Sequence, residues 1–123
     1  MMFEGNLYTI INMEGTGETL NVSVMIIRDH PVFKGHFPGN PILPGVCTLQ
    51  ITGELLSKYV DQKLKLIKSE SIKFMSLVIP DENTILNFEI SLGTTEEKIF
   101  SVKCAVTSNG VDVLKMKGNY LCH

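Results

Sequence analysis

Alternation of hydrophobic and polar residues predicts that most of this chain forms β-strands. Two alternating runs near the start, residues 7–12 and 20–27, flank the turn signal Gly15-Thr16-Gly17 and predict a hairpin. The second half of the chain adds four predicted strands, at residues 72–79, 84–92, 99–106 and 111–121. The last two of these are joined by Asn109-Gly110, a pair that favours a tight hairpin turn.

Between the two groups of strands, residues 46–60 lack proline and carry apolar residues at helical spacing. One stripe of the predicted helix holds Val46, Leu49, Gly53, Leu56 and Val60. Ile51 and Leu55 are apolar on the far side, which leaves a narrow polar wedge. The wedge holds Cys47, Gln50, Glu54 and Lys58. A helix that is apolar on two faces is buried in its protein, so we predict an α+β fold with an antiparallel sheet around one long helix.

The segment that precedes this helix, residues 30–45, reads HPVFKGHFPGNPILPG and contains four of the five prolines. It cannot form a helix or a central strand, and a loop of this length in a compact domain is usually functional. The loop leads into the start of the helix, where free backbone amides can hold an oxygen that becomes negative. A histidine beside such a site, His36, is suited to removing a proton next to a carbonyl.

Composition narrows the class of protein. The 123 residues suffice for one domain, which we place at residues 1–123. Eleven basic against 13 acidic residues, with no basic run, argue against a nucleic-acid partner. No apolar run approaches the ~18 residues of a membrane span, and no secretory signal is apparent. Three widely spaced cysteines indicate reduced thiols in a cytoplasmic protein, and no residue spacing predicts a metal site or a cofactor.

The run His36-Phe37-Pro38-Gly39-Asn40-Pro41-Ile42-Leu43-Pro44-Gly45-Val46 resembles the signature of the hotdog-fold β-hydroxyacyl-acyl carrier protein dehydratases of type II fatty acid synthesis. Weaker similarity covers Phe33-Lys34-Gly35, Ile72-Lys73-Phe74 and Val78-Ile79-Pro80-Asp81. In the last of these segments the family has a Pro-Gly-Asp turn, and this chain lacks the glycine. The resemblance implies a hotdog fold, in which an antiparallel sheet wraps one central helix. It also implies dehydration of a (3R)-3-hydroxyacyl-acyl carrier protein to the trans-2-enoyl thioester, without a cofactor.

The family's residue roles transfer to matching positions. His36 corresponds to the histidine that removes the C2 proton, and the amide of Gly45 to the donor that binds the thioester carbonyl. Further substrate-binding positions implied by the resemblance are Phe37, Val46, Leu49 and Phe74. The resemblance also implies a phosphopantetheine arm, for which Lys34 and Lys73 are candidate contacts.

The chain departs from the family at the second catalytic residue. The helix acid, fourteen positions after the histidine, is replaced by Gln50, and the glutamine usual four residues later is replaced by Glu54. An amide cannot deliver a proton at neutral pH. Glu54 acts through a water molecule or only pairs with Lys58.

Three outcomes of this exchange stay open. Gln50 holds water while His36 performs both proton transfers, another hotdog subunit supplies the acid, or the chain is a silent partner subunit. The family places its two catalytic residues on opposite subunits, which implies a homodimer, with a trimer of dimers or a heterodimer as alternatives. A thioesterase is a further alternative on this fold, and Cys47 is either a nucleophile or a packing residue.

Overall fold

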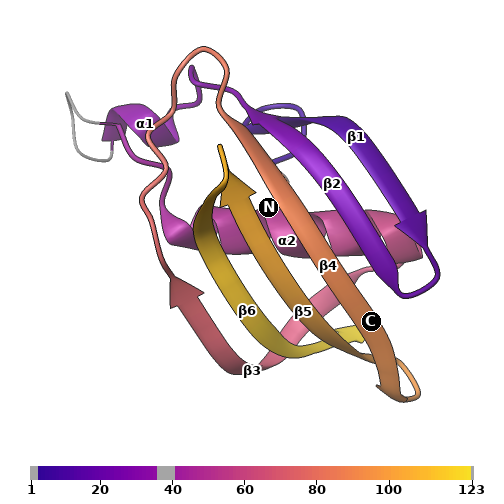
Figure 1. Ribbon diagram of the computed structural model, residues 1–123. Coiled ribbons are helices and arrows are strands. Elements are labelled where there is room, and N and C mark those ends of the chain that lie inside the picture. Colours follow the sequence, from indigo (N-terminus) through magenta and orange to yellow (C-terminus); the bar gives the residue numbers. More distant parts are fainter. Residues whose placement is uncertain (1–2, 36–40, 123) are drawn as a thin grey trace.

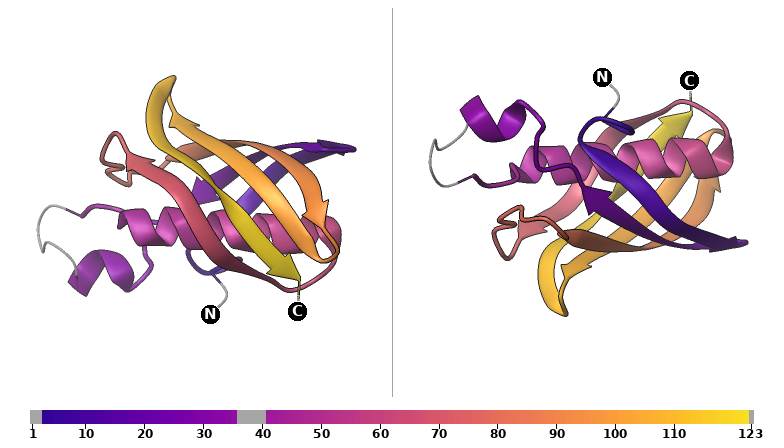
Figure 2. Two further views of the ribbon diagram at one scale, coloured as in Figure 1. Left: turned by 90° about the horizontal axis from the view of Figure 1, so that it is seen from below. Right: turned by 90° about the horizontal axis from the view of Figure 1, so that it is seen from above.

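The computed structural model describes residues 3–35 and 41–122 of the chain. Its six strands form one antiparallel sheet in the order β1-β2-β4-β5-β6-β3. The strands are β1 (Tyr8–Thr16), β2 (Thr19–Ile26), β3 (Leu64–Phe74), β4 (Ile85–Glu96), β5 (Ile99–Ser108) and β6 (Val111–Cys122). A short helix, α1 (Val32–Gly35), precedes the long helix α2 (Gly45–Val60). The sheet curves around α2, which crosses its inner side (Figure 1 and Figure 2).

The hydrophobic core lies between α2 and the inner face of the sheet. In β4, Leu86, Phe88 and Ile90 are at most 1% exposed, while the residues between them face solvent. From the helix, Ile51 and Leu55 are fully buried. Burial of one face gives a strand its two-residue period, so the alternation predicted for β2, β4, β5 and β6 is confirmed.

Turn chemistry fixes both hairpins. Asn109 and Gly110 have φ values of 52° and 76°, as a two-residue turn with positive φ at both positions requires. In the first hairpin β1 runs on to Thr16, so the turn falls at Gly17 and Glu18 rather than at Gly15-Thr16-Gly17.

Neither helix in the described part of the chain has the length and hydrophobicity of a membrane span.

The strand predicted at residues 72–79 is misplaced. β3 begins at Leu64 and ends at Phe74. The Met75 amide still donates to the Val113 carbonyl of β6 over 2.8 Å, and Val78 then forms an isolated bridge with Leu43, outside the sheet. Most side chains of β3 are exposed, because β3 is an edge strand and covers little of the core. A strand without a buried face shows little alternation of hydrophobic and polar residues. The first half of β3 therefore could not be predicted from its pattern.

The predicted faces of α2 are also corrected. The residues packed against the sheet include Cys47, Thr48, Ile51, Thr52 and Leu55. The predicted stripe is open in its first half, where Val46 is 68% exposed and Leu49 and Gly53 are half-buried, but Leu56 further along it is 1% exposed. The helix is apolar on two faces, as predicted, but this chain buries one of them.

Candidate active site

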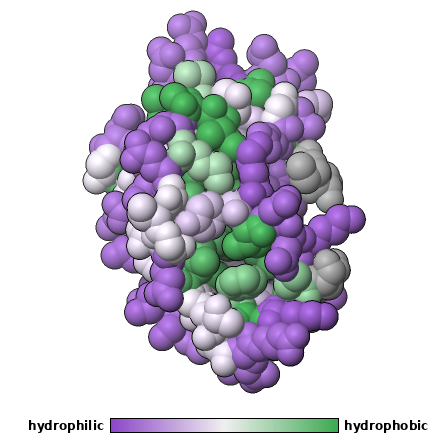
Figure 3. All heavy atoms as spheres, turned by 90° about the vertical axis from the view of Figure 1, so that its right-hand side faces the viewer, coloured by the Kyte–Doolittle hydropathy of each residue, from purple (hydrophilic) through white to green (hydrophobic). Residues whose placement is uncertain are grey.

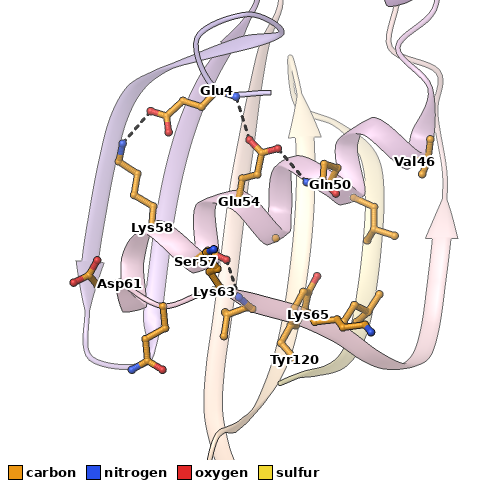
Figure 4. Close-up of a pocket in the computed structure, with 15 residues that line it drawn as sticks. Glu4, Val46, Gln50, Glu54, Ser57, Lys58, Asp61, Lys63, Lys65 and Tyr120 are labelled. Atoms are coloured by element: carbon orange, nitrogen blue, oxygen red, sulfur yellow. Dashed lines mark hydrogen bonds and ion pairs between the residues drawn. The ribbon is translucent and has the colours of Figure 1, made fainter. Parts of the chain in front are cut away.

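A groove of about 1000 Å³ runs along the open side of α2. Its floor is the helix stripe with Val46, Leu49, Gln50 and Gly53, and its far wall comes from β3 and from Tyr120 of β6. Figure 4 shows these side chains converging from the helix and the two strands. The groove exists because the second apolar face of α2 has no covering element among the described residues.

Backbone amides at the start of α2 form the first chemical feature of this side. Pro44 is the N-cap residue, with an extended conformation and no side-chain cap. Among the described residues, the first amide of the helix that donates a hydrogen bond is that of Cys47, to the Pro44 carbonyl at 2.9 Å. The preceding amides, of Gly45 and Val46, are the donors that a helix start offers to a ligand oxygen.

Gly45 is placed under the ring of Phe74. A Cβ atom at this position would come within 2.5 Å of the Phe74 ring, so any other residue would push the ring away. The structure thus brings together two of the residues predicted to bind substrate. Phe74 is 57% exposed, and its ring lies at the surface beside the helix start.

Gln50 and Glu54 lie one helical turn apart on α2 and contact each other. Nε2 of Gln50 donates a hydrogen bond to Oε2 of Glu54 over 3.1 Å (Figure 4). Gln50 is exposed toward the groove, whereas Glu54 is 9% exposed. The residue with the amide faces the open space, and the residue with the carboxylate lies behind it.

The carboxylate of Glu54 is enclosed by donors from the start of the chain. The Phe3 amide lies 2.9 and 2.8 Å from its two oxygens, and the Glu4 amide lies 3.1 Å from Oε1. The Tyr8 hydroxyl donates to Oε1 over 3.0 Å. Burial and the Glu54 charge raise the pKa of Tyr8 far above its usual value, so the hydroxyl keeps its proton.

The predicted pairing of Glu54 with Lys58 is wrong. Nζ of Lys58 lies 2.9 Å from Oε2 of Glu4, on the outside of the same turn (Figure 4). The contacts from Phe3, Glu4 and Tyr8 to the helix had no sequence signal. Their donors are mostly backbone amides, which every residue carries, and they lie about fifty positions from Glu54.

Other predicted residues lie elsewhere. His36 and Phe37 are outside the described residues. Lys34 is exposed on α1, and Lys73 lies on the outer face of the sheet in a separate hollow. Burial raises the pKa of the Cys47 thiol, which favours the packing role over a nucleophile. No three His, Cys, Asp or Glu side chains in the described ranges are grouped to hold a metal ion.

Comparison with known families gives a match over most of the chain. A family model described as "ApeI-like: ApeI dehydratase" matches residues 12–111. A 3-hydroxyacyl-[acyl-carrier-protein] dehydratase FabZ from Lactobacillus helveticus is 27% identical over 111 residues, which cover 80% of this chain and 74% of the relative. The corresponding protein of Ehrlichia chaffeensis is 34% identical over 84 residues, covering 61% of this chain and 59% of the relative.

Solved structures confirm the hotdog fold. The dehydratase heterocomplex ApeI:P from Xenorhabdus doucetiae superposes with a TM-score of 0.74 at 17% identity, covering 92% of this chain and 96% of the other. A hypothetical thioesterase with coenzyme A from Streptococcus pneumoniae gives a TM-score of 0.63 at 17% identity, covering 94% and 85%. At these identities the similarity establishes the architecture of sheet and helix.

Proposed function

This chain belongs to the ApeI-like dehydratase family, and from that premise we propose that it removes water from (3R)-3-hydroxyacyl thioesters carried by an acyl carrier protein. The product is the trans-2-enoyl thioester. Relatives named 3-hydroxyacyl-[acyl-carrier-protein] dehydratase support this substrate class. The observation that carries the proposal is the groove of α2, where Val46, at the start of the helix, and Gln50 line one open side; among the described residues no acceptor is seen for the amides of Gly45 and Val46.

In the proposed reaction His36 accepts the C2 proton of the substrate. The electrons of the C2–H bond form the C2–C3 double bond, the C3–O bond breaks, and the hydroxyl leaves as water with the proton that His36 had received. The Gly45 amide donates to the thioester oxygen, which gains negative charge when C2 loses its proton. Gln50 holds the hydroxyl by hydrogen bonds, since an amide positions but does not protonate. The acyl chain extends along Leu49 and Gly53.

We further propose that a second hotdog chain covers the groove, in a homodimer. β3 is an edge strand, and large hydrophobic side chains near it are exposed. They are Val46, Ile67, Phe74, Met75, Leu77 and Ile79. Several large apolar side chains exposed near one edge of a sheet are typical of an interaction site. The unpaired cysteines of the described chain support a cytoplasmic location.

A second function, that of a partner subunit without its own catalytic acid, is favoured by one observation. Gln50 stands where the family has its acid, and Glu54, which lines the groove one helical turn further on, has its carboxylate bound by the amides of Phe3 and Glu4. The similar ApeI:P heterocomplex is an assembly of two different dehydratase chains. On this alternative, a second hotdog protein supplies the acid.

Incubation of the pure protein with a 3-hydroxyacyl-acyl carrier protein, followed by mass spectrometry, tests the proposal. We expect turnover in the wild type and a loss of about a hundredfold or more in His36→Ala, because general base catalysis contributes 10²–10⁴-fold. The matched control is His30→Asn, since His30 accepts a hydrogen bond from the Val32 amide and an asparagine oxygen can replace it. Equal rates in wild type and His36→Ala would disprove the mechanism. Turnover that requires Gln50→Glu would identify the partner subunit.

A further inference from the structure

We infer that Glu54 is a positioning residue that fixes the side-chain amide of Gln50, and that the amino-terminal turn holds Glu54 in place for this purpose. The amino-terminal turn is the segment of residues 3–8. The role in catalysis rests on the proposed function, because it assumes that Gln50 meets the substrate hydroxyl. The structural part, the hydrogen-bonded order from the turn through Glu54 to Gln50, stands on contacts within the chain (Figure 4).

The amino-terminal turn is a rigid anchor. The amides of Asn6 and Leu7 both donate to the Phe3 carbonyl, at 3.1 and 2.8 Å. Leu7 is fully buried, Phe3 is 9% exposed, and the Leu7 carbonyl accepts from the amide of Ile27 over 2.7 Å. Because these contacts tie the turn to the core, its amides are fixed in direction before they meet Glu54.

The contacts of Glu54 define it as an acceptor at both oxygens. Backbone amides can only donate, and those of Phe3 and Glu4 supply three of its hydrogen bonds. The Tyr8 hydroxyl and the Gln50 amide supply the others. A buried carboxylate with this set of donors is satisfied by contacts within the chain. These contacts suit Glu54 to a positioning role.

An acceptor at Glu54 dictates how Gln50 is turned. The amide of a glutamine has a donor side and an acceptor side, which are distinguished by their partners. With Oε2 of Glu54 at 3.1 Å, the NH₂ group must face Glu54, and the carbonyl oxygen faces away from it. A hydroxyl is a donor, so this orientation suits the 3-hydroxyl of the proposed substrate. Loss of Glu54 removes the acceptor at 3.1 Å toward which the NH₂ group is turned.

These contacts explain how the chain accommodates glutamine at position 50 and glutamate at position 54, the reverse of the family's order. In this chain the carboxylate lies one helical turn further along the groove, where the amino-terminal turn satisfies it by hydrogen bonds. At position 50 the groove presents a neutral amide with a defined orientation. Glu54 acts on the reaction only through Gln50, and its loss should lower kcat more than it raises KM.

A structural measurement comes first, on the full chain. The chain has two glutamines, Gln50 and Gln62, so selective ¹⁵N labelling gives two side-chain NH₂ signals in an NMR spectrum. Both side chains are exposed, and we expect the Gln50 NH₂ protons to exchange with water more slowly than those of Gln62 because they are bonded to Glu54. The protection should persist in Tyr8→Phe and disappear in Glu54→Gln, whose spectrum carries a third NH₂ signal from position 54. Equal exchange of the two glutamines in the wild type would overturn the inference, even if the substitutions at position 54 did not fold.

The kinetic test compares two variants that remove contacts from the same carboxylate. Tyr8→Phe deletes a donor to Oε1 and leaves the Gln50 contact to Oε2. We expect a smaller loss of kcat for Tyr8→Phe, which removes one of several donors to Glu54, than for Glu54→Gln, where we expect a loss of about tenfold or more, since small misplacements can cost up to 10²-fold. Glu54→Asp keeps the charge but withdraws it by one methylene, and should fall between the two. Equal losses in Tyr8→Phe and Glu54→Gln would show a merely structural role.

The last test exchanges the two residues and so restores the hydrogen bond between positions 50 and 54 in the opposite direction. In Gln50→Glu/Glu54→Gln the donor is at position 54 and the acceptor at position 50, so the hydrogen bond can form again. We expect this double variant to exceed Gln50→Glu in kcat and to gain a pH dependence from the new carboxylic acid. No advantage over Gln50→Glu would contradict the coupling. A wild type without turnover refutes the proposed function alone, and the NMR comparison then decides the inference.

Discussion

Two glycines show how a single methyl group would act at different places in this molecule. At Gly118 in β6, an added Cβ would lie 2.5 Å from the backbone oxygen of Lys68 on β3. At Gly53 in α2, the nearest atom would be Cε2 of Tyr120 at 3.8 Å, an ordinary contact. The first position needs glycine for close packing of two strands, and the second does not.

We therefore expect substitutions at these glycines to have opposite effects on the free energy of unfolding. Gly118→Ala should destabilise by about 1–3 kcal/mol, because the clash is with backbone and cannot be relieved by rotating a side chain. Gly53→Ala should stabilise by about 0.5–1 kcal/mol, the difference in helix propensity. Urea unfolding of both variants measures the difference. A Gly118→Ala variant as stable as the wild type would show that the β3 and β6 backbones can separate.

At the scale of single residues, what the sequence could predict depended on how far apart the partners lie. Gly45, Gln50 and Glu54 could be proposed as site residues from the sequence because one contiguous motif and one helix hold them. The amides of Phe3 and Glu4 were missed, since a backbone donor leaves no trace in residue identity and tertiary packing alone brings it to Glu54.

Among the elements, the outer face of the sheet concentrates positive charge. Lys103 of β5 is directly opposite Lys117 of β6, and Lys115 of β6 is opposite Lys73 of β3. One carboxylate, Glu70, lies 3.4 Å from Lys117. Like charges at directly opposed positions destabilise a sheet, so this face carries repulsion that the strands' inner faces must offset.

Relief of that repulsion should be measurable. We expect Lys103→Glu to raise the free energy of unfolding by about 0.2–1 kcal/mol, because it places opposite charges across the β5–β6 ladder. The gain should shrink as salt is added, since the lysines are exposed and screened. Lys63→Glu, in the loop after α2, is the control for a change in net charge alone. A gain of the same size in Lys63→Glu would assign the effect to net charge.

The same elements differ in how readily the sequence predicts them. Strands β2, β4, β5 and β6 each bury one face on α2, and their alternation located them. β3 lies at the edge with most side chains exposed, so its pattern was too weak to place its start. The two faces of α2 were both recognised as apolar, but periodicity cannot say which of two apolar faces a single chain will bury.

At the scale of the whole molecule, hydrophobic side chains reach the surface. Figure 3 shows hydrophobic patches bordered by hydrophilic residues on the face that lies at the right-hand side of Figure 1. Near the edge strand β3, the exposed apolar residues include Leu77 at 72% and Ile79 at 66%. An edge strand beside exposed apolar groups is a template for pairing with another chain.

The proposed homodimer makes this surface testable. We expect analytical ultracentrifugation of the wild type to give the mass of a dimer, and Ile67→Lys on β3 to shift it toward the monomer, because a charge would then be buried at the paired edge. Val111→Lys, at the start of β6, is the matched control, since Val111 and Ile67 are 53% and 45% exposed. A wild type that sediments as a monomer at micromolar concentration would contradict the homodimer.

The short distance between Gln50 and Glu54 also constrains how such a sequence can change over time. Codons for glutamine and glutamate differ by a single base, so each of the two positions can switch easily. The order of the switches matters, however. A chain with glutamate at both positions would set two carboxylates against each other at about hydrogen-bond distance, where they cannot both ionise. An intermediate with glutamine at both positions lacks that conflict. Mutational paths between the order Gln50 and Glu54 and the reverse order should therefore pass through this intermediate.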